Sequence, residues 1–277
     1  MSDWGSDTVS DTTRQFDVVQ VRGGSRRTQP DRAATEEPLE IRLHGQSFAV
    51  IMRTPGHDRE LSAGFLLSER VISTSDDIGA IAHCADADAE NIVNVRLTDE
   101  SILDRTLADR RQVTTNSSCG LCGRRTIESL IVSLPPLAPR WSIDPSILIA
   151  LPNRLRAAQA AFDMTGGLHA AALFACDGNL VEVAEDVGRH NAVDKVIGRM
   201  LLREALPLSS HILCVSGRTS YEIVQKAVIA GIPLVAAVSA PSSLAIDLAA
   251  ASGLTLVGFV RGDSFNIYTH PERIAAT

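Results

Sequence analysis

The sequence has little of what several large classes of protein depend on. Aromatic residues make up only 4% of its 277 residues, which leaves little material for stacking on single-stranded nucleic acid. The chain also has no excess of positive charge, since 26 basic residues against 33 acidic ones give a formal net charge of −7. That balance argues against nucleic acid or an anionic membrane surface as the main partner, but it allows a small anion held by a few local arginines.

Signals for export or for a membrane are also missing. No apolar run approaches the roughly 20 residues that a membrane-spanning helix needs. The opening residues, MSDWGSDTVSDTTRQFDVVQ, contain no basic segment followed by an apolar one, so we expect a cytoplasmic protein. Five cysteines, an odd number, argue against a disulfide framework in a reducing compartment.

The pattern of residues predicts three regions. Residues 1–36 are polar with little periodicity, which predicts a flexible tail. Residues 37–110 predict a small α+β domain, with two strands around the turn at His44–Gly45, a helix starting at Thr54–Pro55 and the strand NIVNVRL. Residues 111–277 predict a larger α/β domain that carries a C-x-x-C loop.

The larger domain alternates apolar strands with helices. Strands are expected at 169–175, 180–186, 211–217, 232–239 and 254–261, and helices at 125–133, 145–162, 191–205, 219–230 and 243–252. Thr219 and Glu222 have the spacing of a capping box. Continuous apolar strands that alternate with helices are typical of a parallel sheet covered on both faces.

Polar or small loops follow the strands of this sheet, where such sheets bind ligands. Three of these loops carry an arginine: Arg189, Arg218 and Arg261. Arginines together with backbone N–H groups at helix starts predict a site for a phosphate-bearing anion. The sequence has no Walker motif and no G-x-G-x-x-G, so neither standard nucleotide signature applies.

The stretch SSCGLCGR contains the cysteine pair Cys119 and Cys122. Its glycines leave few side chains to pack, and Arg124 and Arg125 would favour the thiolate forms of the cysteines. A redox dithiol, half of a zinc site and a sulfur carrier are the three alternatives. A closed zinc site needs four ligands, and no second C-x-x-C exists. The polar stretch TTNSS ahead of the pair predicts a mobile loop, which favours delivery between two sites.

Six segments resemble the formate dehydrogenase accessory sulfurtransferase family, FdhD, and the resemblance runs from about residue 36 to 273. These segments are SSCGLCG, TGGLHAAALF, EDVGRHNAVDKVIG, SGRTSYEIVQKA, AVSAPSSLAIDLA and LVGFVRGDSFNIYTHPERI. The resemblance implies a small N-terminal domain, a cytidine-deaminase-like three-layer α/β domain and a homodimer. EDVGRHNAVDK is the most specific of the motifs.

The resemblance also implies a chemistry. Members take persulfide sulfur from a cysteine desulfurase and pass it to the molybdenum or tungsten bis-guanine-dinucleotide cofactor, so that formate dehydrogenase becomes active. By match of motif, Cys119 would carry the sulfur and Cys122 would assist. The cofactor, Mo-bis(molybdopterin guanine dinucleotide), would be a ligand or substrate, with no permanently bound metal. Its expected contacts are Phe259, Val260, Arg261, Gly262, Asp263 and Ser264, with Arg189, His190, Ser216 and Arg218 nearby.

Two other functions compete with sulfur transfer. One is a binding module that protects and hands over the cofactor without carrying sulfur. The other is a zinc-dependent nucleobase enzyme, which would show H-x-E and P-C-x-x-C. Here His169 is followed by Ala170 and Ala171, and Ser118 stands at the proline position, so neither of these two motifs is present.

Overall fold

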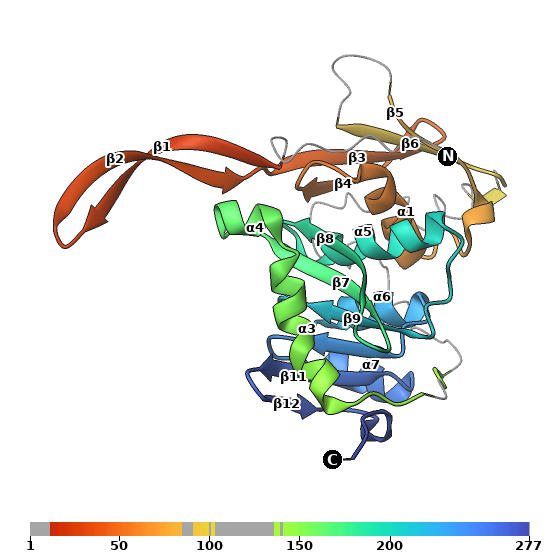
Figure 1. Cartoon of the computed structure of the whole chain (residues 1–277). Helices are drawn as coiled ribbons and strands as arrows, with labels where there is room; N and C mark the ends of the chain where they lie inside the picture. The colour runs from red at the N-terminus through yellow and green to blue at the C-terminus, as the bar shows by residue number, and fades with distance from the viewer. Residues whose placement is uncertain (1–11, 85–90, 100, 103–135, 139–140, 277) are drawn as a thin grey trace.

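The computed structural model describes residues 12–84, 91–99, 101–102, 136–138 and 141–276. Cys119, Cys122 and the helix expected at 125–133 lie outside the described residues. The described chain forms two sheets, the helices packed on them and a projecting two-stranded arm (Figure 1). No helix among the described segments is long and apolar enough to cross a membrane.

The N-terminal sheet has the strand order β4-β3-β6-β5. Its members are β3 (Glu37–Leu43), β4 (Gln46–Arg53), β5 (Ile78–His83) and β6 (Ile92–Leu97). The predicted hairpin at His44–Gly45 is confirmed, and both turn residues have positive φ, 49° and 82°, as a tight hairpin turn requires. Alternate residues of β3, namely Leu39, Ile41 and Leu43, are fully buried.

Helix α1 (Asp58–Ser68) follows this hairpin and starts later than expected. Its N-cap is His57 in the left-handed conformation, without a side-chain capping bond. Thr54 therefore caps no helix, although the sequence predicts a start there. Its backbone and hydroxyl instead bond to the second sheet: Thr54 N donates to Asp186 Oδ2 over 3.2 Å, and Val187 N donates to Thr54 Oγ1 over 3.1 Å.

The second sheet has the order β12-β11-β10-β9-β7-β8. Its members are β7 (His169–Ala175), β8 (Leu180–Asp186), β9 (His211–Val215), β10 (Leu234–Ala237), β11 (Thr255–Arg261) and β12 (Ser264–Ile267). Strands β9, β10 and β11 are parallel, as predicted. The sheet as a whole is mixed, because β7 and β12 run antiparallel to their neighbours.

Helices cover this sheet on both faces, so the expected three-layer α/β architecture is confirmed. Helices α5 (Arg189–Leu202), α6 (Tyr221–Ile229) and α7 (Ser243–Ala251) pack on one face, and α3 (Pro145–Ala157) packs on the other. The single helix expected at 145–162 is divided, with α4 (Ala160–Thr165) as a separate piece. Two short 3-10 helices, η1 (Ser75–Asp77) and η3 (Pro271–Arg273), lie outside these layers in the sequence order.

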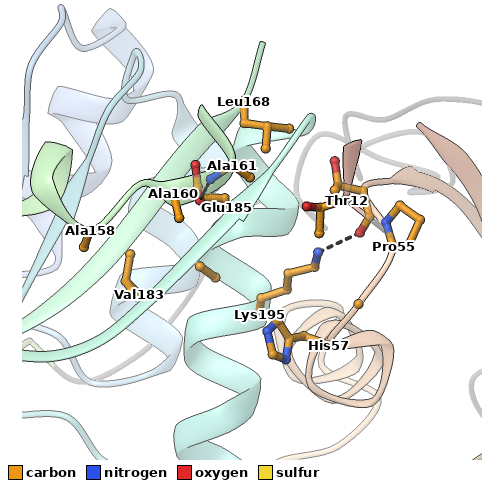
Figure 2. A pocket seen from close by; sticks show the side chains of 13 residues that line it. Thr12, Pro55, His57, Ala158, Ala160, Ala161, Leu168, Val183, Glu185 and Lys195 are labelled. Carbon is orange, nitrogen blue, oxygen red and sulfur yellow. Dashed lines mark hydrogen bonds between the residues drawn. The ribbon is translucent and has the colours of Figure 1, made fainter. Parts of the chain in front are cut away.

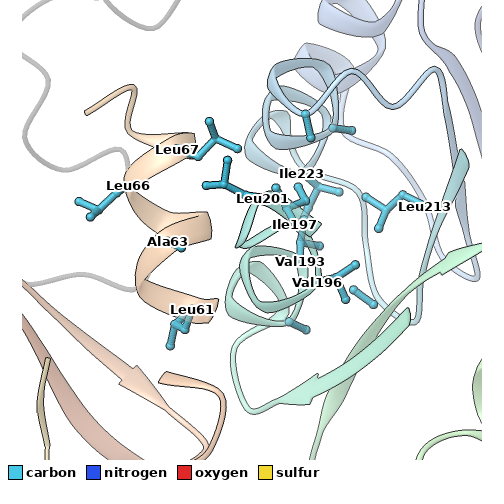
Figure 3. Close-up of a cluster of buried hydrophobic side chains, with 14 of the residues drawn as sticks. Leu61, Ala63, Leu66, Leu67, Val193, Val196, Ile197, Leu201, Leu213 and Ile223 are labelled. Atoms are coloured by element: carbon cyan, nitrogen blue, oxygen red, sulfur yellow. The ribbon is translucent and has the colours of Figure 1, made fainter. Parts of the chain in front are cut away.

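The two parts of the chain share one hydrophobic core. Leu61 and Leu67 of α1 belong to the same buried cluster as Val193 and Ile197 of α5 (Figure 3). The helices cross closely because each presents a glycine to the other's backbone. A Cβ added at Gly198 would lie 1.9 Å from the carbonyl oxygen of Glu60, so only glycine fits at this crossing.

The N-terminal arm corrects the expectation of a flexible tail over residues 13–34. Strands β1 (Thr13–Arg22) and β2 (Ser25–Ala34) pair antiparallel in continuous register. Gly23 and Gly24 form the turn with positive φ values of 54° and 83°. The sequence contains a signal for this hairpin, because a Gly-Gly pair follows a segment with one Phe and three Val, residues that favour strands.

Candidate functional site

The strand ends of the second sheet meet at one edge, as the sequence predicts. Strand β8 is antiparallel to β7, and β7 is antiparallel to β9, so the carboxyl ends of β8, β9, β10 and β11 lie on the same side. Backbone hydrogen bonds connect the loops that follow. Thr219 N donates to Ala240 O over 3.2 Å, and Phe259 N donates to Ser239 O over 3.2 Å. We call this set of loops the carboxyl edge.

The Ser216 loop is bound to the first residues of β7. Ser216 N donates to Ala170 O over 3.0 Å, and its Oγ accepts from Ala170 N over 2.9 Å. The hydroxyl of this expected site residue is therefore engaged in positioning the loop. It also places Gly217 against His169, since a Cβ on this glycine would lie 3.3 Å from His169 Nδ1.

Basic side chains gather at this end of the carboxyl edge. Burial, together with the nearby charges of Arg189 and Arg218, lowers the pKa of His169. The buried Nε of Arg189 has no hydrogen-bond partner among the described residues. A buried guanidinium N–H without a partner costs free energy, and an anion at the carboxyl edge would satisfy it. His169, the first residue of β7, pairs with Asp186 at the end of β8 and so lies at the same edge of the sheet.

The segment 259–264 forms the other end of the carboxyl edge, but it does not lead into a helix. Strand β11 continues to Arg261, and the chain turns back into β12. Phe259 has a φ of 54°, which is strained for an aromatic residue. Arg261 Nε donates to Val238 O over 2.9 Å, and its guanidinium lies 5.7 Å from the Phe259 ring centroid. Val260 is 1% exposed, so its side chain faces the core.

The remaining residues of this turn, Gly262, Asp263 and Ser264, are exposed. The carboxyl edge therefore presents Phe259 and Arg261 at one end, and Arg189, Arg218 and His169 at the other. Strand β11 is two places from β9 and four places from β8 in the sheet, which separates its end from theirs by about 10 Å and about 19 Å. An extended ligand with phosphates and a flat base could span such distances.

The side chain of His190 contacts the first turn of α6. Its Nε2 lies 3.1 Å from Ser220 Oγ and 3.1 Å from Glu222 Oε2. The prediction of a capping box between Thr219 and Glu222 is therefore wrong. Ser220 is the N-cap of α6, and the Glu222 carboxylate turns to His190 because α5 packs beside it.

A buried ionic cluster lies beneath His190. Lys226 Nζ donates to both carboxylate oxygens of Asp194 at 2.8 Å, and Ser68 Oγ donates to Asp194 Oδ1 at 2.8 Å. Burial raises the pKa of Asp194 against the effect of Lys226. Burial also raises the pKa of Glu222 to about 7, helped by the charges of Asp194 and Glu69 and opposed by Lys226 and Arg189.

We predict that Glu222 makes the stability of the protein depend on pH. The carboxyl stays protonated in the folded state until pH approaches 7, whereas the unfolded chain ionises near pH 4.5. Its contribution to stability is therefore present below pH 4.5 and is lost as the pH rises through 7. Between pH 5 and 8 the free energy of unfolding of the wild type should fall by about 2 to 3 kcal/mol relative to that of Glu222→Gln.

Urea unfolding of the two proteins across this pH range measures the difference. Glu204→Gln, a substitution at an exposed carboxylate, is the matched control and should follow the wild type. Parallel curves for the wild type and Glu222→Gln would show that Glu222 is ionised throughout.

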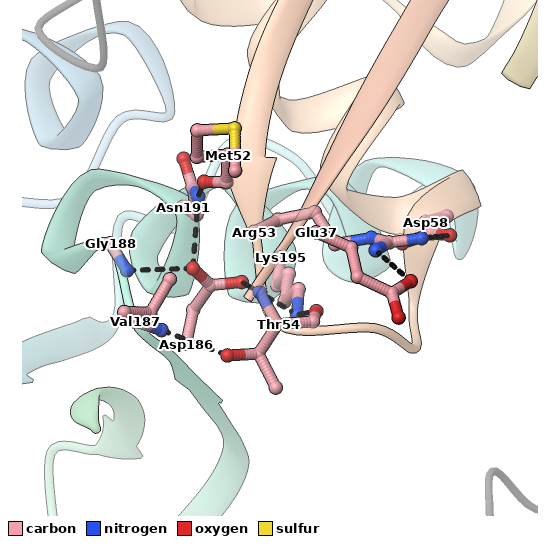
Figure 4. A network of polar contacts seen from close by, with 10 residues as sticks. All are labelled: Glu37, Met52, Arg53, Thr54, Asp58, Asp186, Val187, Gly188, Asn191 and Lys195. Atoms are coloured by element: carbon pink, nitrogen blue, oxygen red, sulfur yellow. Dashed lines mark hydrogen bonds and ion pairs between the residues drawn. The ribbon is translucent and has the colours of Figure 1, made fainter. Parts of the chain in front are cut away.

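The motif EDVGRHNAVDK divides into two parts. Asp186, Asn191 and Lys195 connect the two sheets: Asp186 accepts from Gly188 N at 2.7 Å and from Asn191 Nδ2 at 2.9 Å, and it pairs with Lys195 Nζ at 2.8 Å (Figure 4). Lys195 Nζ also donates to Thr54 O over 2.8 Å. Arg189 and His190, from the same motif, belong to the carboxyl edge.

A cavity of about 170 Å³ lies beside Lys195, between the β4–α1 loop, β8 and α4 (Figure 2). Its lining is mainly apolar, and it includes His57, Leu168 and Val183. None of the residues expected to contact the cofactor lines this cavity. The cavity adjoins the end of β8, because Glu185 in its lining precedes Asp186, the last residue of that strand.

The described cysteines do not form a metal site. Cys214 is fully buried, and burial raises its pKa to about 12, as expected for a small core residue. Cys176 is only half-buried, and its Sγ donates to Ser210 O over 3.0 Å. Cys84 is also half-buried. Among the residues that the structure describes, no group of three or more His, Cys, Asp or Glu side chains could hold a metal ion.

Comparison with known proteins gives consistent matches over nearly the whole chain. Residues 34–275 match the model of the FdhD/NarQ family. A sulfur carrier protein FdhD from Streptomyces avermitilis is 53% identical over 95% of this chain and 96% of the relative, and one from Sulfolobus acidocaldarius is 46% identical over 94% and 98%. A crystal structure from Desulfotalea psychrophila, described as a formate dehydrogenase accessory protein, is 27% identical with a TM-score of 0.76 and covers 95% of this chain and 100% of its own.

Proposed function

Because the chain belongs to the FdhD/NarQ family, we propose that it is a sulfur carrier that serves the maturation of formate dehydrogenase. In this proposal it accepts sulfur as a persulfide from a cysteine desulfurase. It then passes the sulfur to the molybdenum or tungsten bis-guanine-dinucleotide cofactor, which is its substrate. The names of the relatives and the chemistry of the C-x-x-C motif support the sulfur-carrying role.

Loading needs no external oxidant or reductant. The Cys119 thiolate attacks the terminal sulfur of the donor persulfide, the S–S bond of the donor breaks, and the donor leaves as a thiolate. Cys122 assists by shielding the new persulfide or by releasing its sulfur through a disulfide with Cys119. Arg124 and Arg125 next to the motif favour the thiolate form in both steps.

The observation that carries the proposal for the acceptor is the chemistry of the carboxyl edge. The buried Nε of Arg189 has no hydrogen-bond partner among the described residues. The charges of Arg189 and Arg218 both lower the pKa of His169, so the two arginines lie near the same histidine. The cofactor carries diphosphate groups, which arginines and backbone N–H groups bind well. These residues therefore fit the proposed substrate.

Guanosine diphosphate binding tests the acceptor half of the proposal. We expect calorimetry to show binding by the wild type that Arg189→Ala or Arg218→Ala weakens by about 10- to 100-fold, since a charge-assisted hydrogen bond to phosphate is lost. Arg203→Ala is the control, because Arg203 pairs with Glu182 and is exposed. Equal affinities in all four proteins would place the ligand elsewhere.

A further inference from the structure

The cavity beside Lys195 combines an apolar lining with one buried ammonium group. Its volume of about 170 Å³ is close to that of a cavity of about 150 Å³ that binds benzene in another protein. The apolar part of the lining includes Leu168, Val183, Ala160 and Ala161. The space therefore suits a molecule of about the size of a substituted benzene ring.

Lys195 supplies a hydrogen-bond donor to this lining. Its side chain is 1% exposed, and Figure 2 shows its ammonium group between Pro55 on one side of the cavity and Glu185 on the other. A lysine ammonium group has three N–H donors. Two of them are used by Thr54 O and Asp186 Oδ2, each at 2.8 Å. The third has no acceptor among the described residues, and a buried donor without a partner costs free energy.

The charges around the cavity favour a neutral ligand. The Lys195 ammonium is already paired with the Asp186 carboxylate, so a second anion would be desolvated without a free positive charge to pair with. Glu185 adds another carboxylate to the lining, and its oxygens accept from Ala161 N at 2.9 Å and from Phe162 N at 2.7 Å. A cation, in turn, would lie beside the Lys195 ammonium. The third N–H of Lys195 is therefore suited to an uncharged acceptor, such as a carbonyl oxygen.

We propose that this cavity is a binding site for a small neutral molecule that has an apolar body and one carbonyl oxygen. The oxygen accepts the third N–H of Lys195, and the apolar body lies against Leu168, Val183 and the alanines of α4. The molecule then contacts both the β4–α1 loop and β8, where Lys195 already connects the two sheets. The inference goes beyond the proposed function, because it does not depend on whether the chain carries sulfur.

Calorimetric titration of the full chain with acetophenone tests the proposal. Acetophenone has an aromatic ring and a carbonyl oxygen, and cumene has the same number of non-hydrogen atoms without the acceptor. We expect acetophenone to bind with one molecule per chain and cumene to bind about 10-fold or more weakly, since the hydrogen bond from a charged donor is absent. Benzoate, which is matched in size but anionic, should not displace acetophenone.

Two substitutions reduce the space in the cavity without removing a hydrogen-bonding side chain. Ala158→Leu and Ala160→Leu enlarge side chains of the lining that are not fully buried, so circular dichroism should show an unchanged fold. Each should weaken acetophenone binding by about 10-fold or more, because the leucine takes up space that the ring needs. Ala157→Leu is the matched control: Ala157 is exposed at the end of α3 and lies outside the lining, so this variant should bind as the wild type does.

The absence of acetophenone binding would overturn the proposal, as would equal affinities for acetophenone and cumene. Displacement of acetophenone by benzoate at lower concentration would also overturn it, because the site would then prefer an anion. If neither Ala158→Leu nor Ala160→Leu weakened binding, acetophenone would occupy another part of the molecule and the assignment of this cavity would be wrong.

Discussion

Replacement of Cys119 by alanine is expected to reduce activation of formate dehydrogenase to the level found without this protein, a loss of about a thousand-fold or more. The substitution removes the sulfur atom that would carry the persulfide in the proposed mechanism. Guanosine diphosphate should still bind to Cys119→Ala, since the carboxyl edge is unchanged. Activity of formate dehydrogenase matured in the presence of each variant measures the effect.

Cys176→Ala is the matched control for this experiment. Cys176 is half-buried, its Sγ donates to Ser210 O, and burial raises its pKa, so it should be a poor nucleophile. Its variant should activate formate dehydrogenase as the wild type does. Full activation by Cys119→Ala, with undiminished ligand binding, would instead favour the alternative of a binding module that hands over the cofactor without carrying sulfur.

Gly198→Ala is expected to destabilise the protein by about 3 kcal/mol or more, although alanine is the better helix former by about 1 kcal/mol. The added Cβ would lie 1.9 Å from Glu60 O and 2.6 Å from Gly64 N. Both are backbone atoms, so no side-chain rotation can relieve the overlap and α1 and α5 must separate. That separation would loosen the packing of Val193 and Ile197 against Leu61.

Thermal unfolding measures this effect, and a decrease in Tm of about 10 °C corresponds to it for a chain of this size. Gly167→Ala is the control, because the nearest atom to its added Cβ is 3.7 Å away, an ordinary contact. A Gly198→Ala variant as stable as Gly167→Ala would mean that the two helices do not cross this closely.

The sequence predicted the central part of the fold because its strands are apolar runs and its tight turns contain glycine. Strands β7 and β8 lie where the apolar pattern placed them, and the turn at His44–Gly45 is the expected one. The convergence of the strand-end loops followed from topology alone. The meeting of Arg189 and Arg218 near His169 adds a detail that depends on the antiparallel direction of β7, which periodicity does not encode.

Two features were missed for different physical reasons. The arm has a hairpin composition, but its many polar and charged residues resemble a tail, since both of its faces are exposed. Glu222 has the spacing of a capping box with Thr219, and only the packing of α6 against α5 turns its carboxylate to His190. A local pattern cannot show which of two partners a side chain prefers when the second partner arrives through tertiary contacts.

Intact mass spectrometry of the protein after incubation with a cysteine desulfurase and cysteine is the most direct test of sulfur carriage. The wild type should gain the mass of one sulfur atom, and a thiol reductant should remove it, because a persulfide exchanges with thiols. Cys176→Ala should gain the same mass and Cys119→Ala should gain none. Equal loading of Cys119→Ala and the wild type would contradict the account.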